Sequence, residues 1–304
     1  MKTYKTLLLM IVLLFISGPL HSADSVTKVI LLGTGTPVPD PSQSGCSIAI
    51  VVNDVPYIID FGPGLIRKAA ALSPQYGGSE KGLEIRNIKK AFLTHMHSDH
   101  TTGYPDLILT PWVMGRDETL EVFGPEGIKQ MTNDILLAYQ QDINYRIHGS
   151  EHANDQGWRV NAHEIKEGVI YKDNLIEVEA FLVNHGSWSN AYGFRFTTPD
   201  RVIVISGDTA PCENILKYAK GVDILLHEVY SKSKFEMRNE ESKEYHSTHH
   251  TSTYEVGEIA KKTNPGLVVL YHILFWGASE DDLLREIAEV YSGKVVVGKD
   301  LSIY

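Results

Sequence analysis

Three histidines and one aspartate fall within six residues in the segment THMHSDH, residues 94–100. The preceding apolar run, residues 91–93, is typical of a short buried strand. In an extended segment His95 and His97 point the same way, because side chains alternate between the two faces. Neutral imidazoles and carboxylates bind zinc, manganese and iron. If the chain then turns into a helix, this one loop supplies two ligands to each of two neighbouring metals.

Three further strand-like runs end on residues that can bind metal. They are rich in apolar and β-branched residues, as buried strands are, and they occupy residues 176–183, 201–206 and 267–271. The residues that follow them are, in chain order, His185, Asp208 and His272. A metal site in a layered sheet protein collects side chains from several strand ends, so these endings support the site predicted at residues 94–100.

On these residues the chain resembles the metallo-β-lactamase superfamily, whose signature is His-x-His-x-Asp-His. The resemblance covers residues 27–304 and implies an α/β fold (α+β by some schemes), a four-layer αββα sandwich with metals at one edge. It implies two Zn²⁺, with Mn²⁺ or Fe tolerated by the same ligands. One metal is expected on His95, His97 and His185, and the other on Asp99, His100 and His272, with Asp208 bridging.

The expected nucleophile is a hydroxide held between the metals, because zinc lowers the pKa of bound water from 15.7 to about 7. No Ser or Cys nucleophile is needed. By the same resemblance, Asp99 is expected to be a catalytic residue as well as a ligand. Asp60 ends another strand-like run where the family has an aspartate. The resemblance gives Asp60 a supporting role beside the His-rich loop.

The chain also resembles one branch of the superfamily, which contains ribonuclease Z and exported arylsulfatase-like proteins. In that branch a His-Glu pair after a strand, here His227-Glu228, supports a mobile catalytic histidine. Two histidines compete for that role. His246 begins the branch's His-Ser-Thr tripeptide, whereas His250 stands eight residues before Glu258, which is the branch's spacing to its helix. We favour His250, with His246 as the alternative, as the proton donor to the leaving oxygen.

Residues 1–23 are typical of a secretory signal peptide. Lys2 and Lys5 precede an apolar run at residues 7–16, which is shorter than the roughly twenty residues that span a membrane. The prediction is a cleaved leader and one hydrolase domain, residues 24–304, that is periplasmic or secreted and has no stable membrane anchor. An uncleaved anchor is the alternative.

The chain of 304 residues is acidic, with a formal net charge of −10. Removing residues 1–23 would make the charge −12, because they carry two lysines and no acidic residue. Nucleic-acid binders usually have a basic footprint, and no Gly/Pro-rich arm of the kind ribonuclease Z uses stands out, so nucleic acid is not the expected partner. Cys46 and Cys212 are predicted to be separate thiols rather than a disulfide. The sequence leaves a homodimer open.

These observations predict an exported metal-dependent hydrolase of small-molecule esters, above all aryl sulfates or phosphodiesters. Trp112 and Trp188 could stack on an aromatic leaving group, although core packing is the commoner role of a tryptophan. The alternatives are a lactonase or β-lactam hydrolase, a tRNA 3′-end endonuclease like ribonuclease Z, and a non-catalytic metal-binding scaffold. A scaffold is disfavoured because every ligand position is filled.

The expected secondary structure alternates strands with helices. Residues 140–175 are polar and predicted to be irregular, and residues 245–252 are predicted to open a helix. Further strands are expected at 29–32, 47–52, 57–60, 190–196 and 294–297, and helices at 65–72, 126–139, 212–220, 253–262 and 281–291.

Overall fold

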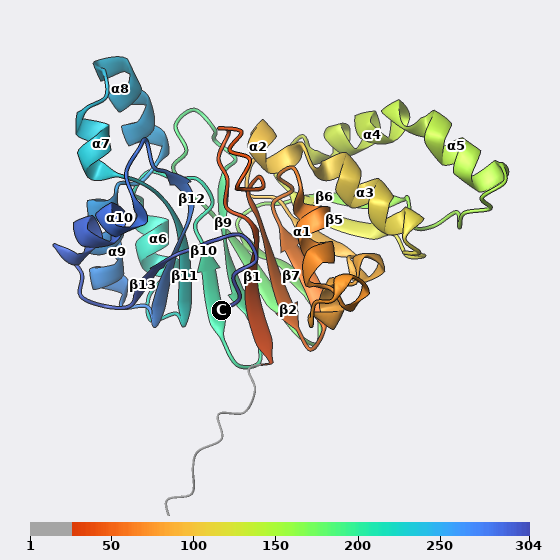
Figure 1. Cartoon of the computed structure of the whole chain (residues 1–304), viewed down its shortest axis with the longest axis horizontal. Coiled ribbons are helices and arrows are strands. Elements are labelled where there is room, and N and C mark those ends of the chain that lie inside the picture. The colour runs from red at the N-terminus through yellow and green to blue at the C-terminus, as the bar shows by residue number, and fades with distance from the viewer. Residues whose placement is uncertain (1–25) are drawn as a thin grey trace, which may run out of the picture.

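Two β-sheets face each other between outer layers of helices in the computed structural model, which describes residues 26–304 (Figure 1). The signal peptide predicted for residues 1–23 lies outside the described residues. The four-layer αββα prediction is therefore confirmed. No helix in residues 26–304 is both long and apolar enough to cross a membrane.

The first sheet has the strand order β1-β2-β3-β4-β5-β6. Neighbours from β1 to β3 pair antiparallel, and those from β3 to β6 pair parallel. The strands are β1 (Thr27–Gly33), β2 (Ser47–Val52), β3 (Val55–Ile59), β4 (Lys90–Phe92), β5 (Leu120–Gly124) and β6 (Val160–Glu164).

The second sheet has the order β13-β12-β11-β10-β9-β8-β7, antiparallel from β7 to β10 and parallel from β10 to β13. Carboxyl ends of parallel strands meet at one edge of a sheet, which is where ligands bind in open α/β sheets. The strands are β7 (Gly168–Lys172), β8 (Glu177–Leu182), β9 (Tyr192–Thr197), β10 (Val202–Ile205), β11 (Ile224–Tyr230), β12 (Leu267–Leu274) and β13 (Val295–Val297).

The space between the sheets is filled by one apolar cluster to which both contribute. The ring centroid of Phe92, in β4, lies 5.6 Å from that of Phe196 and 6.1 Å from that of Phe194, both in β9, and both contacts are edge-on. Such aromatic pairs add roughly 0.5–1.5 kcal/mol each beyond the burial of their area. This packing fixes β4 against the second sheet, and the His-rich loop begins directly after β4.

Helices bury the outer face of each sheet. On the first sheet lie α1 (Leu65–Leu72), α3 (Tyr104–Val113) and α4 (Ile128–Ala138); on the second lie α6 (Glu213–Tyr218), α9 (Thr253–Thr263) and α10 (Glu280–Ala288). The remaining helices are α2 (Ser98–Thr101), α5 (Gln140–His148), α7 (Lys232–Glu236) and α8 (Glu240–His249). In Figure 1, α8 rises at one end of the molecule, α4 and α5 extend at the other, and α2 lies between them.

The predicted helix at residues 65–72 is confirmed by α1, and α4, α6, α9 and α10 also lie close to their predicted ranges. The prediction for residues 140–175 was wrong, because α5, β6 and β7 occupy much of that segment. Both strands lie at sheet edges, where exposed polar side chains hide the strand pattern. Residues 245–249 end α8 rather than open a helix. Cys46 and Cys212 are free thiols, as predicted.

Arg116 is fully buried just after α3. Within the described residues, all hydrogen bonds of its side chain go to backbone carbonyls. Its guanidinium donates to the oxygens of Ile88, Leu107, Ile108 and Gly157 at 2.6–3.2 Å. Burial lowers the pKa of Arg116 to about 9. The side chain therefore satisfies carbonyls of α3 and ties this helix to two loops.

Replacing Arg116 with methionine should lower the free energy of unfolding by about 3–5 kcal/mol, because buried carbonyls lose their donors. Urea unfolding of the full chain measures this loss. The control is Arg86→Met, since Arg86 is exposed and, among the described residues, forms an ion pair only with Glu84. This control should change the free energy of unfolding by no more than about 0.5 kcal/mol. Equal unfolding midpoints for the two variants would contradict the role assigned to Arg116.

Candidate metal centre

The predicted ligands converge at the edge where the strands of both sheets end. The His-rich loop leaves β4, His185 follows β8, Asp208 follows β10, and His272 lies within β12. The backbone N–H of Tyr192 donates to the Thr94 carbonyl at 2.9 Å and joins the loop to the second sheet. The two sheets therefore contribute jointly to one site.

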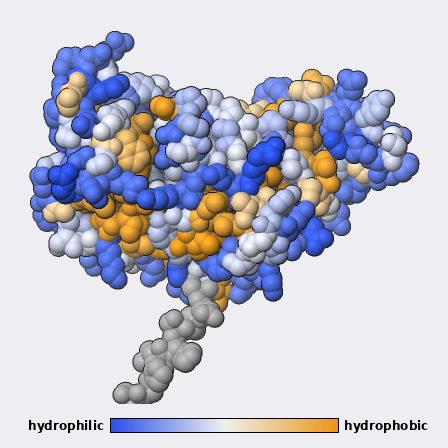
Figure 2. All heavy atoms as spheres, in the orientation of Figure 1, coloured by the Kyte–Doolittle hydropathy of each residue, from blue (hydrophilic) through white to orange (hydrophobic). Residues whose placement is uncertain are grey.

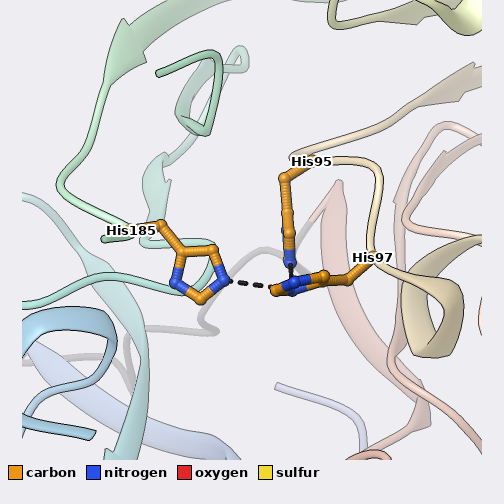
Figure 3. A group of neighbouring side chains, drawn as sticks. All are labelled: His95, His97 and His185. Carbon is orange, nitrogen blue, oxygen red and sulfur yellow. Dashed lines mark hydrogen bonds between the residues drawn. The ribbon is translucent and has the colours of Figure 1, made fainter. Parts of the chain in front are cut away.

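His95, His97 and His185 form the first group. His97 Nδ1 lies 3.0 Å from His95 Nε2 and 3.1 Å from His185 Nε2. The ring of His185 points toward those of His95 and His97, which share one loop (Figure 3). Nitrogens bound to tetrahedral zinc at 2.0–2.1 Å lie ~3.3 Å apart. The spacing thus fits a shared cation.

Asp99, His100 and His272 form the second group. Asp99 Oδ2 lies 3.1 Å from His272 Nε2 and 3.5 Å from His100 Nε2. Asp208 lies between the groups, 3.6 Å from His100 Nε2, 3.5 Å from His272 Nδ1 and 3.9 Å from His95 Nε2. This is the position that a bridging carboxylate requires.

The unpaired polar atoms of the site support metal binding. His100 Nε2, His272 Nδ1 and Asp208 Oδ1 are buried and have no hydrogen-bond partner within residues 26–304. Burying such atoms without partners costs roughly 1–3 kcal/mol each. Burial opposes a charge on Asp208, but His272 and His100 outweigh it and hold the pKa of Asp208 well below its usual value. A carboxylate with clustered imidazoles fits a pair of zinc, manganese or iron ions.

Asp60 holds the His-rich loop from behind. Its Oδ1 accepts from the Thr94 N–H at 2.8 Å and from the Thr94 hydroxyl at 3.0 Å, and its Oδ2 lies 2.9 Å from His100 Nδ1. These bonds leave His100 Nε2 facing the other ligands. Asp60 thus has the supporting position that the resemblance implied. Cys46, buried beside Asp60 and His100, was not predicted to lie here.

The end of α8 holds His185. His185 Nδ1 donates to the His249 carbonyl at 2.9 Å, which leaves Nε2 free for metal, and the Gly186 N–H donates to the Thr248 carbonyl at 3.0 Å. Gly186 has φ +57°, and a Cβ there would lie 1.9 Å from His249 Nε2. No sequence pattern predicts these contacts, because they join residues that are far apart in the chain.

Trp188 lies beside the first group rather than in the core. Its indole N–H donates to His97 Nε2 at 2.7 Å, with the ring centroids 4.8 Å apart. The bond turns Nδ1 of His97 toward His95 and His185. Trp112, the other tryptophan considered as a stacking residue, is buried and donates to the Asn154 carbonyl.

Glu228 and His250 form a buried pair at the edge of the ligand cluster. His250 Nδ1 lies 3.3 Å from Glu228 Oε2, and Glu228 Oε1 accepts from the Thr251 N–H at 2.8 Å. The His250 ring stacks 6.0 Å from that of His272. Burial, and then Asp208, raise the pKa of Glu228, whereas burial lowers the pKa of His250 to about 4.

The other two histidines proposed for catalysis are placed differently. His246 lies one helical turn before His250, and its Nδ1 donates a hydrogen bond to the Ser242 carbonyl at 2.7 Å. His227 is buried, bonds to the Glu228 carbonyl at 2.7 Å and belongs to none of the possible metal-binding groups among the described residues. Its strand neighbours Leu225 and Val229 pack on the helical layer, opposite the face of Glu228. The structure therefore does not bring His227 to the site.

Comparisons with known proteins agree with this architecture. A family model described as "Beta-lactamase superfamily domain" matches residues 57–273. Ribonuclease Z of Mycobacterium sp. (strain KMS) is 30% identical over 280 residues, covering 90% of this chain and 94% of that protein. Ribonuclease Z of Mycobacterium bovis (strain BCG / Pasteur 1173P2) is 28% identical, with 90% and 96% covered.

Solved structures share the fold. The metallo-beta-lactamase fold protein YhfI from Bacillus subtilis has a TM-score of 0.70 at 18% identity, covering 91% of this chain and 99% of that one. Human tRNase Z, short form, has a TM-score of 0.65 at 20% identity, with 91% and 98% covered. The relatives support the ribonuclease Z side of the predicted branch and give no support to its arylsulfatase-like side.

Removing one ligand should remove one metal. The parent protein is expected to bind about two zinc ions per chain, and His272→Ala about one, because the second group then loses a donor. Elemental analysis after dialysis measures this, with His163→Ala as the control, since His163 pairs with Glu121 outside the cluster. A chelator should also lower the melting temperature of the parent. Unchanged zinc content in His272→Ala would contradict the assignment.

Metal binding should displace the Trp188 hydrogen bond. If Nδ1 of His97 binds metal, the proton of the neutral ring sits on Nε2, which can then no longer accept from an indole N–H. Tryptophan fluorescence should therefore change during zinc titration, and Trp188→Phe should abolish most of that change. Trp158→Phe is the control and should retain it. A full-sized change in Trp188→Phe would rule out this coupling.

Proposed function

The chain belongs to the metallo-β-lactamase superfamily, in its ribonuclease Z-like branch, and we propose that it is a metal-dependent endonuclease acting at the 3′ end of tRNA. One observation carries the proposal: the His250–Glu228 pair lies at the edge of the metal-ligand cluster, where a leaving oxygen can be protonated. The 28–30% identity to ribonuclease Z over 90% of the chain supports it.

This proposal replaces the small-molecule ester hydrolase favoured by charge and by the leader-like N-terminus. Net charge describes the whole surface, whereas substrate choice depends on the groups around the site. A small-molecule phosphodiesterase with the same chemistry is the second candidate, because the net charge of −10 favours it. Export through residues 1–23 stays a proposal under either function.

The ligand set would hold two metal ions, and these would supply a water of lowered pKa and polarise the phosphoryl oxygen. Asp60 and Thr94 keep the His-rich loop in place. Burial favours the neutral forms of both His250 and Glu228, so the pair holds a proton that can be passed to the leaving oxygen. A ribose oxygen needs that proton far more than a nitrophenolate does.

A substrate panel tests the reaction class. The zinc-loaded protein should cleave precursor tRNA at its 3′ trailer and bis(p-nitrophenyl) phosphate, but not nitrophenyl sulfates or lactones, because the site is assigned to phosphodiesters. Turnover is measured by gel and by absorbance. Cleavage of the nitrophenyl phosphate without cleavage of any RNA would favour the second candidate. Turnover of lactones or sulfates alone would refute both.

Leaving-group dependence tests His250. His250→Ala should lower turnover of precursor tRNA by roughly 10²–10⁴-fold, and that of bis(p-nitrophenyl) phosphate far less, because nitrophenolate leaves without protonation. Zinc content should stay at the parent level. His246→Ala, which removes the competing candidate, should lower the RNA rate less than His250→Ala does. A larger RNA-specific loss in His246→Ala would transfer the role to His246.

A further inference from the structure

A row of rings leads from the metal ligands toward α8. His272 stacks on His250 at 6.0 Å, His250 lies 5.8 Å from His246, and His246 lies 4.7 Å from Trp276, edge-on at 81°. Trp276 belongs to the loop that follows His272 and has φ +47°, which is uncommon for a bulky residue. The last ring of the row therefore lies farther from the metal ligands than His250 does.

Arg238 lies against this last ring. Its guanidinium carbon is 5.0 Å from the centroid of Trp276, and its Nε donates to the Ser242 hydroxyl at 3.0 Å. Tyr230 packs on Trp276 with centroids 5.5 Å apart. The tryptophan ring and one hydrogen bond thus restrain the guanidinium, while the side chain stays exposed.

The two terminal nitrogens of Arg238 have no hydrogen-bond partner, and no carboxylate lies within ion-pairing distance, anywhere in the described part of the chain. This is notable in a protein with 38 acidic against 28 basic residues. The glutamates of α8 at positions 240, 241 and 244 are exposed, whereas Ser242 and His246 are half-buried. Glu240 is also neutralised by Lys243 at 3.1 Å. The α7–α8 end is mostly hydrophilic (Figure 2).

We propose that Arg238, held against Trp276, binds a backbone phosphate of the RNA away from the one that is cleaved. The inference rests on the proposed function and names a residue that selects chains with several phosphates. A guanidinium presents a planar fork that matches phosphate oxygens. Because Trp276 and Ser242 already restrain the Arg238 guanidinium, less side-chain entropy is lost when it binds phosphate.

Binding of a fluorescein-labelled single-stranded RNA to the zinc-loaded protein, followed by anisotropy at several salt concentrations, tests this directly and needs no turnover. Arg238→Gln should raise Kd roughly tenfold, as expected for a charge-assisted hydrogen bond. The slope of log K against log salt should fall by about 0.7, the value for one phosphate contact on a single strand. Arg238→Lys should recover the salt slope but only part of the affinity.

Two controls test whether the effect is specific to Arg238 and to the Trp276 ring beneath it. Arg159→Gln is matched, because Arg159 also lies 5.0 Å from a tryptophan centroid, that of Trp158, but on the segment after α5; it should bind RNA like the parent. Trp276→Phe should bind more tightly than Trp276→Leu, because phenylalanine keeps a flat surface under the guanidinium. Turnover of bis(p-nitrophenyl) phosphate, which has a single phosphate, should fall less than that of RNA in Arg238→Gln.

The outcomes are distinct. An unchanged salt slope and Kd in Arg238→Gln would overturn the phosphate contact even if RNA is cleaved. A parent protein that does not bind RNA would overturn it as well. RNA bound through Arg238 but never cleaved would instead remove the proposed function and leave the contact intact.

Discussion

The structure depends on one electrostatic constraint: imidazoles and carboxylates crowd into a buried site where several of their polar atoms have no partner within residues 26–304. His100 Nε2, His272 Nδ1 and Asp208 Oδ1 are all in this state. Such a cluster costs folding free energy unless cations compensate for it. The surrounding fold holds these donors together. Phe92 packs between the two sheets, and Asp60 is hydrogen-bonded to His100 of the His-rich loop.

The metal ligands and the proton donor are not independent parts. The His249 carbonyl orients His185, and the next residue, His250, contacts Glu228. The end of α8 therefore positions a metal ligand and the proposed acid through one short segment. A displacement of α8 would disturb both His185 and His250, so under the proposed function this helix would couple metal binding to proton delivery. Trp188 adds a second link, from the loop of His185 to His97.

The net charge of this protein and the names of its relatives point to different substrates. The acidic total favoured small molecules, whereas the relatives that match 90% of the chain are ribonucleases Z. The proposed RNA contact would reconcile the two locally, because a few well-placed donors can bind a phosphodiester chain on a protein whose total charge is acidic. Arg238 is the donor proposed here, held near the Trp276 ring and free of carboxylates among the described residues. Acidic residues elsewhere reduce non-specific binding of nucleic acid.

The sequence by itself identified the candidate ligands and the fold class, since the His-rich loop, His185 and Asp208 follow strands, and His272 lies within one, whose apolar pattern is local. It also favoured His250 over His246, through a helix register that fixes relative position. The tertiary structure alone decided which atoms meet: His227 faces the helical layer, Trp188 contacts His97, and Arg238 lies on Trp276. Those contacts join residues from separate segments, and periodicity describes only the face on which a residue lies, not the partner that packing brings to it.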